Sequence, residues 1–276
     1  MAPDMQSTEE LLETLKEINF RISGGRFSGF SDESINFFND YPEDPSHAKE
    51  WWISLGSNLE HGIYHNHLKP EFHALIVDLI EIISTVDAGI QTDVKQCVSR
   101  PNSQGSRRRY IPYYWGAIHY AKGETSKKSM EIQFFINLTK MGLRVGIYVG
   151  KQKKDDGQWS GFDKRLRKRS EEVYKELILL VDEKGFDFVR TNDQDHAKGS
   201  IGTKLSVTNS DDLINHVLDY TGEKKEFTLL KTISKERLFS RDLIQEILTI
   251  FVETRRIYEI LESSGKMKKI RRLRTE

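Results

Sequence analysis

Apolar residues recur with two different spacings along this chain of 276 residues. The stretch PEFHALIVDLIEIIS, residues 70–84, begins with proline and spaces its apolar side chains three and four residues apart, which predicts a helix. The same spacing predicts helices over residues 7–19 and 169–185, and a long one over residues 240–263. The helical pattern therefore dominates both ends of the chain.

The middle of the chain changes to the alternation that is typical of strands. In EIQFFINLT, residues 131–139, every second residue is large and apolar, and LRVGIYVG, residues 143–150, repeats that pattern after a turn at Lys140–Gly142. These two stretches predict a hairpin, and YYWGAIHYA, residues 113–121, predicts a third strand. We therefore expect an α+β fold with an antiparallel sheet of at least three strands, about residues 110–150, flanked by helices.

A change in composition near residue 190 predicts two parts. Residues 1–190 are expected to form the α+β core domain. Residues 191–276 are expected to form a loop-rich and helical extension that ends in the basic tail GKMKKIRRLRTE.

Composition narrows the class of protein. No apolar run approaches the ~18 residues that a membrane span needs, and the acidic N-terminus lacks a secretory pattern. A single cysteine, Cys97, excludes an intramolecular disulfide and a cysteine-based zinc cluster. We expect a cytoplasmic protein with no membrane partner.

The net charge of zero conceals a strong asymmetry. Residues 1–50 carry eleven acidic and four basic residues, whereas residues 95–175 carry nineteen basic and seven acidic ones. Such a separation is typical of proteins that bind polyanions, although the basic segment could equally form a solvated face balanced by the acidic N-terminus.

The segment SRRRYIPYYWGAIHYAKG, residues 106–123, combines bases with aromatic residues. Within a strand, Tyr113 and Trp115 share one face and Tyr114 points to the other, so one face is expected to present an aromatic residue. Tyr113, Trp115 and Tyr148 are therefore candidates to contact a base. The candidates to contact the phosphate backbone are Arg107, Arg108, Arg109, Lys151, Lys153 and Lys154. The alternative is that Tyr114 or Trp115 is core and the arginines lie at a sheet edge.

A second basic cluster lies in KRLRKRSEEV, residues 164–173, and adds Arg165, Arg167, Lys168 and Arg169 to the backbone candidates. The segment is expected to open a helix, where bases oppose the helix dipole. That cost would favour a role for these charges in binding a ligand.

Catalytic motifs give little support for an enzyme. The chain has no phosphate-binding loop, no dinucleotide fingerprint and no nucleophile elbow, so no catalytic residue and no cofactor are predicted. His61 and His65 are four residues apart and could share a helix face, which leaves a metal-dependent enzyme built on residues 60–95 as one alternative. A protein-interaction module that uses the long C-terminal helix is another.

The segments RFSGFSDESINFF, KEWW, HLKPEFHALIVDLIEII and RRRYIPYYWGAI resemble an uncharacterised bacterial family over about residues 20–175. The positions that match are Phe27, Gly29, Phe30, Glu33, Phe37, Trp51, Trp52, Pro70, Phe72, Leu75, Asp78, Leu79, Pro112 and Tyr113. The chain departs from that family at residues 100–113, where RPNSQGSRRRYIPY lacks two expected acids. The resemblance therefore implies a fold and no activity.

A second resemblance joins IPYYWGAI to LRVGIYVGK. The order and spacing of these two motifs resemble those in the N-terminal domains of McrB-type restriction GTPases. Those domains recognise modified DNA, some by flipping a base into an aromatic pocket. The resemblance implies a DNA-binding specificity module of a restriction or defence system, with RNA as the less favoured ligand. It also implies an AAA+ GTPase motor as partner, in cis or in trans. It places Tyr113, Trp115 and Tyr148 in the pocket and Arg107–Arg109 with Lys151–Lys154 in the backbone clamp.

Overall fold

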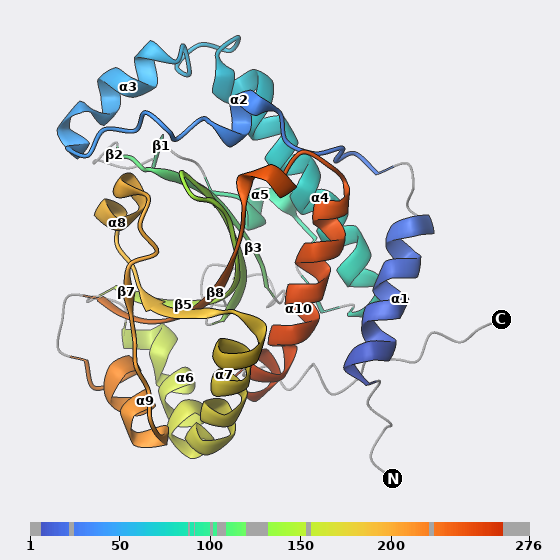
Figure 1. Cartoon of the computed structure of the whole chain (residues 1–276), viewed down its shortest axis with the longest axis vertical. Coiled ribbons are helices and arrows are strands. Elements are labelled where there is room, and N and C mark those ends of the chain that lie inside the picture. The colour runs from blue at the N-terminus through green and yellow to red at the C-terminus, as the bar shows by residue number, and fades with distance from the viewer. Residues whose placement is uncertain are drawn as a thin grey trace.

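The computed structural model describes residues 7–21, 25–87, 89–90, 92–99, 102–103, 109–119, 132–152, 156–220 and 224–261. Within these ranges, a six-stranded antiparallel sheet carries helices on its outer side (Figure 1). This arrangement confirms the predicted α+β fold.

The strands lie in the spatial order β3-β4-β5-β8-β6-β7. Their bounds are β3 (Tyr113–Ile118), β4 (Gln133–Thr139), β5 (Gly142–Gln152), β8 (Lys224–Ile233), β6 (Asp187–Arg190) and β7 (Thr203–Lys204). The pairing of Thr139 with Gly142 closes the hairpin predicted between β4 and β5. A separate ribbon is formed by β1 (Asn102–Ser103) and β2 (Arg109–Tyr110).

The helices differ in length and bury different faces. They are α1 (Thr8–Arg21), α2 (Asp32–Ile35), α3 (Ala48–Ser54), α4 (Lys69–Val86), α5 (Val94–Cys97), α6 (Asp156–Lys168), α7 (Ser170–Lys184), α8 (Asp193–Lys198), α9 (Ser210–Val217) and α10 (Asp242–Leu261). A π-helical turn, Tyr64–Leu68, precedes α4, and short 3-10 helices lie at Pro45–His47 and Lys235–Arg237. No helix in the described part of the chain is long and apolar enough to cross a membrane.

Strand β8 corrects the expected division of the chain. It pairs with β5 over ten residue positions, from Leu143 opposite Ile233 to Gln152 opposite Lys224, and its other edge pairs with β6. The part of the chain after residue 190 therefore supplies an inner strand of the sheet, and a boundary at residue 190 would cut through one structural unit.

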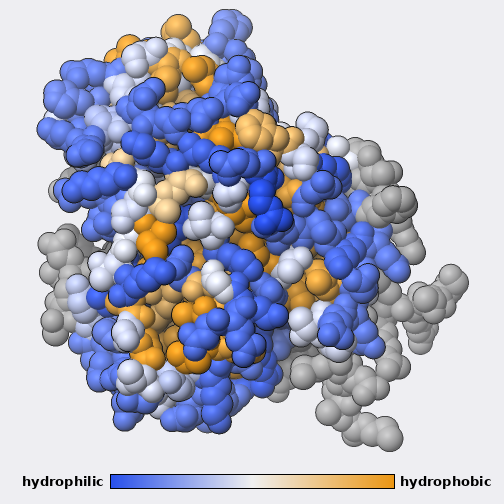
Figure 2. All heavy atoms as spheres, viewed as in Figure 1, coloured by the Kyte–Doolittle hydropathy of each residue, from blue (hydrophilic) through white to orange (hydrophobic). Residues whose placement is uncertain are grey.

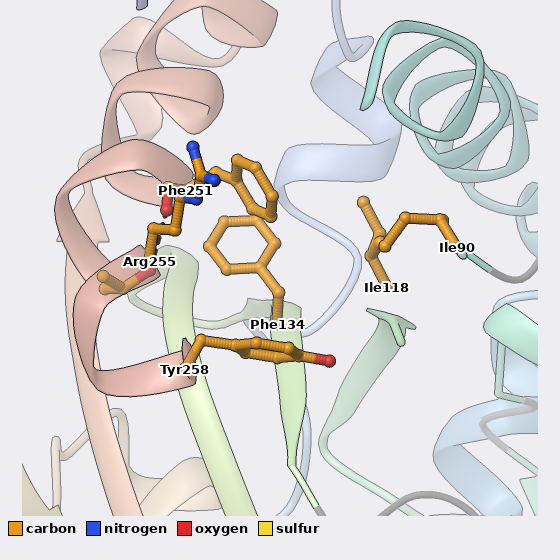
Figure 3. A pocket seen from close by; sticks show the side chains of 7 residues that line it. Ile90, Ile118, Phe134, Phe251, Arg255 and Tyr258 are labelled. Carbon is orange, nitrogen blue, oxygen red and sulfur yellow. Dashed lines mark hydrogen bonds between the residues drawn. The ribbon is translucent and has the colours of Figure 1, made fainter. Parts of the chain in front are cut away.

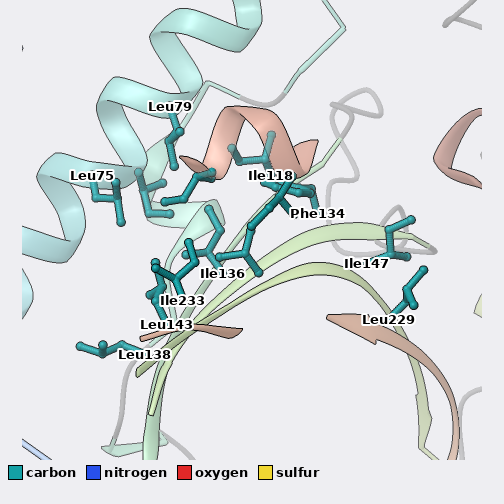
Figure 4. Packing of buried hydrophobic residues seen from close by; sticks show 14 of the residues in the cluster. Leu75, Leu79, Ile118, Phe134, Ile136, Leu138, Leu143, Ile147, Leu229 and Ile233 are labelled. Atoms are coloured by element: carbon teal, nitrogen blue, oxygen red, sulfur yellow. The ribbon is translucent and has the colours of Figure 1, made fainter. Parts of the chain in front are cut away.

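The sheet is strongly arched, as Figures 1 and 4 show. Gly146 lies within the arched strand β5, and its φ of +152° is one that side-chain-bearing residues rarely adopt. A Cβ atom at this position would lie 2.2 Å from the carbonyl oxygen of Leu229 on the neighbouring strand. The arch gives the sheet a convex and a concave face.

The convex face holds the main hydrophobic core. Alternate residues of the inner strands, among them Ile136, Val145 and Leu229, are fully buried there, and Figure 4 shows Ile136 on the side of the sheet that faces α4. Phe134 of β4 packs edge to face on Phe251 of α10, with ring centroids 5.1 Å apart. Because the strands alternate, their other side chains necessarily line the concave face.

Helix α10 belongs to this core. Its apolar residues are buried, including Leu243, Ile247 and Leu248, and it packs against α1, α7 and β5. The apolar residues of the long C-terminal helix are therefore part of the core of the described structure.

A buried carboxylate fixes the N-terminal segment to the helices. Asp78 of α4 is fully buried and accepts hydrogen bonds from the backbone N–H groups of Arg26 and Phe27, each at 3.1 Å. Its Oδ2 also receives Nη1 of Arg241 at 2.9 Å. One side chain thus joins three segments that are distant in the sequence.

Candidate nucleic-acid interface

Three aromatic rings form a row across the concave face. Phe135 lies between Trp115 and Tyr148, with ring centroids 5.4 Å and 5.0 Å away respectively. The row packs on Ala117 and Leu230, apart from the main core, and both outer rings are only half-buried. We call Trp115, Phe135 and Tyr148 the aromatic row.

The alternation predicted for β3 is confirmed. Tyr114 is fully buried on the convex face, with its ring centroid 4.6 Å from that of Phe72. Tyr113 and Trp115 consequently share the concave face and are half-buried. The concave face therefore carries partly exposed aromatic residues, and the burial of Tyr114 also agrees with the alternative in which Tyr114 or Trp115 is core.

Tyr113 is engaged by α8 and does not join the aromatic row. Its ring centroid lies 4.7 Å from that of His196, and its hydroxyl donates to Oδ1 of Asp193 at 3.2 Å. Of the three base-contact candidates, the structure therefore brings Trp115 and Tyr148 together through Phe135 and places Tyr113 under a short helix.

Polar side chains continue the concave face beside the aromatic row. The register places Trp115, Asn137, Arg144 and Thr232 directly opposite one another on β3, β4, β5 and β8. Within the described part of the chain, the buried Oδ1 of Asn137, Oγ1 of Thr232 and all three guanidinium nitrogens of Arg144 have no hydrogen-bond partner. We call Asn137, Arg144 and Thr232 the polar row.

Arg144 is the most unusual member of this row because its side chain is 0% exposed. Burial lowers the pKa of its guanidinium, while the nearby carboxylates of Asp187, Glu226 and Asp195 act in the opposite direction. Asp187 is itself paired with Lys204 at 2.7 Å. Three carboxylates thus face two cations, so this part of the concave face has no surplus of positive charge.

The first basic cluster is only partly described. Arg107, Arg108, Lys153 and Lys154 lie outside the described residues. The backbone of Arg109 belongs to β2, and that of Lys151 to the end of β5, where the register places it opposite Lys225 of β8.

The second basic cluster corrects an expectation. Residues 164–168 end α6 and do not open a helix, so their charges favour the helix dipole. Arg165 donates to the carbonyl oxygen of Leu261 at 2.6 Å, and Arg167 pairs with Asp219 at 2.5 Å. Arg169 forms two hydrogen bonds with the carboxylate of Glu172, which raise its pKa. The three arginines make these intramolecular contacts, and Lys168 is exposed.

The histidine cluster does not form the expected pair. His61 lies in a turn before the π-helical segment that holds His65, so the two do not share a helix face. Nδ1 of His67 lies 3.9 Å from a carboxylate oxygen of Glu33 and 4.0 Å from one of Glu71. Across the described ranges, no group of three His, Cys, Asp or Glu residues is arranged to hold a metal ion.

A cavity lies between α10 and the convex face (Figure 3). Its volume is about 10 Å³, and its lining includes Phe134, Phe251 and Tyr258. That volume is at the lower limit for one water molecule, so this cavity is too small for an organic ligand.

Comparison with protein-family profiles, curated proteins and solved structures finds no significant match to this chain. Function must therefore be inferred from the site.

Several residues of this site were missed as functional candidates. The strands over residues 131–150 alternate between core positions and intervening positions, and the intervening positions hold Phe135, Asn137 and Arg144. A charged residue such as Arg144 is rare inside a buried strand. That rarity was the available signal. The cross-strand register that joins Arg144 to Thr232 had no counterpart in the local sequence.

Proposed function

We propose that this chain is a nucleic-acid-binding specificity module, with DNA preferred over RNA, that holds an unpaired base on the aromatic row. The observation that carries the proposal is the half-exposed arrangement of Trp115 and Tyr148 around Phe135, on the sheet face opposite the main core. Aromatic side chains with partly exposed ring faces provide stacking surfaces for bases, each worth about 1–3 kcal/mol.

The charge distribution supports the same proposal. Lys151 belongs to the basic segment 95–175, and the register places it opposite another lysine, Lys225, at one end of the sheet. The three arginines at 107–109 belong to the same segment and precede β3. Figure 2 shows hydrophilic residues over most of the face in view, with apolar residues in separate patches between them. Phosphates would bind at the basic ends of the strands, while the concave face would hold the base.

The second basic cluster has no part in this proposal, because Arg165, Arg167 and Arg169 serve intramolecular contacts. Recognition of a modified base and cooperation with an AAA+ GTPase motor are what the McrB-type resemblance favours. They extend the proposal to a restriction or defence system.

The test is the affinity of the full chain for short single-stranded, duplex and cytosine-methylated DNA and for RNA, at several salt concentrations. Trp115→Ala should weaken binding about 5- to 150-fold, the equivalent of 1–3 kcal/mol. Phe239→Ala is the matched control, because Phe239 is an aromatic residue that is 48% exposed and lies outside the aromatic row. Negligible binding to every nucleic acid would refute the proposal, and so would an equal loss in both variants.

A further inference from the structure

The polar row contains a concentration of unmet hydrogen-bonding capacity. More than nine in ten buried polar groups in proteins have a partner, because an unmet one costs free energy. Within the described residues, Arg144 leaves three donors unpaired, and Asn137 and Thr232 each leave one buried oxygen without a partner. These atoms lie on three adjacent strands, which indicates a site for a polar ligand.

The register orders the functional groups in a line. Starting from the aromatic row, Trp115 is followed by Asn137 and then by Arg144, each directly opposite the next. Directly opposite side chains on one face have Cβ atoms about 4.5–5.5 Å apart. A flat ring stacked on Trp115 would thus lie with an edge beside the Asn137 oxygen and the Arg144 guanidinium.

The charged groups around Arg144 favour a neutral ligand over an anionic one. Three carboxylates act on Arg144, and one of them, Asp187, is paired with Lys204, so these groups together would give a phosphate dianion no net attraction. A neutral ligand with acceptor atoms can accept hydrogen bonds from the guanidinium N–H groups without adding charge to the site. The fork of arginine offers two parallel donors, and the Asn137 oxygen offers an acceptor.

We infer that Arg144 and Asn137 read a base edge that presents two adjacent acceptors followed by a donor. This inference rests on the proposed function. Guanine has such an edge in N7, O6 and N1–H, and cytosine has one in O2, N3 and the N4 amine. Adenine and thymine lack it, and a methyl group on C5 of cytosine leaves it unchanged.

Access to this edge requires a local movement, because Arg144 has no solvent exposure. Helix α8 lies on the concave side of the sheet (Figure 1). It is a short helix that begins after Asn192 and ends at Gly199, which has a φ of +70°. Tyr113 contacts the His196 ring and the Asp193 carboxylate of this helix, and His196 and Ala197 are buried, so a movement of α8 would have to break these packed contacts.

The test uses nine-nucleotide oligo-dT strands that carry one central dG, dC, dA or dT. The full chain should bind the dG or the dC strand roughly ten- to a hundred-fold more tightly than the other two, as expected for a bidentate contact. Arg144→Gln should remove that preference, so that the four strands bind with similar affinity.

Probe variants keep the inference falsifiable if Arg144→Gln fails to fold. With unmodified protein, 7-deazaguanine removes N7 and 3-deazacytosine removes N3, so each should lower affinity for its strand about tenfold or more. Equal binding of the deaza and natural bases would overturn the inference, while a loss of oligo-dT binding in Trp115→Ala would leave the proposed function standing. Competition by inorganic phosphate that disappears in Arg144→Gln would also overturn it, since the guanidinium would then hold an anion. No binding to any strand would overturn both proposals.

Discussion

Replacing Asp78 should destabilise the protein far more than replacing any exposed acid nearby. Its carboxylate is 0% exposed and accepts hydrogen bonds from two backbone N–H groups and from the guanidinium of Arg241. Breaking a buried ion pair from one side costs about 3–5 kcal/mol, because the remaining charge is left without its partner. Arg241 is 27% exposed and keeps some solvation, which places the expected cost near the lower end of that range.

We therefore expect Asp78→Ala to lower the free energy of unfolding by about 3 kcal/mol. Asp78→Asn retains one oxygen that can accept a hydrogen bond but loses the charge, so about 2 kcal/mol is expected. The measurement is urea denaturation monitored by tryptophan fluorescence and by circular dichroism.

Glu81→Ala on the same helix provides the matched control. Glu81 lies 3.3 Å from Arg26, but their side chains are 47% and 63% exposed. Exposed pairs contribute about 0–1 kcal/mol, so this variant should remain close to the unmodified protein. If Asp78→Ala costs no more than Glu81→Ala, the assigned role of the buried carboxylate is wrong.

Three further predictions concern other parts of the molecule. Burial raises the pKa of the Cys97 thiol to about 12, so at pH 8 the folded protein should react slowly with a thiol-specific reagent, whereas the denatured protein should react at once. Rapid labelling of the folded protein would contradict this prediction. Gly146→Ala should cost about 2 kcal/mol or more in urea denaturation and Gly185→Ala only about 1, because both positions have positive φ but only the first would also place a Cβ against backbone. Replacement of Arg107–Arg109 by alanine should weaken the binding of DNA of every sequence. It should also reduce the slope of log affinity against log salt concentration by roughly 0.9 for each phosphate that these arginines neutralise. An unchanged slope would exclude them from the backbone clamp.

Local periodicity was sufficient for the hairpin but not for the whole sheet. Residues 131–150 alternate clearly, and the glycine at 142 allows the turn, so β4 and β5 follow from neighbouring residues alone. The place of β8 beside β5, by contrast, depends on pairing between residues that are far apart in the sequence. Such pairing leaves no local signal.

The site was predictable to a similar extent. Alternation placed Tyr113 and Trp115 on one face, and the structure brings Trp115 to Tyr148 through Phe135. The interpretation of the cluster at 164–169 was wrong because the cluster was expected to open a helix, whereas residues from Asp156 onward already form α6. A shift of the helix start reversed the sign of the dipole argument.

The late position of β8 also constrains how the chain can fold. The inner edge of β5 stays without its partner until residues 224–233 have left the ribosome, long after residues 142–152 have been synthesised. Such a high contact order slows folding, and an unpaired inner strand is a surface on which chains aggregate. A nascent chain would thus need protection by chaperones through the synthesis of residues 153–223, and any fragment cut before residue 224 would expose the edge of β5 permanently.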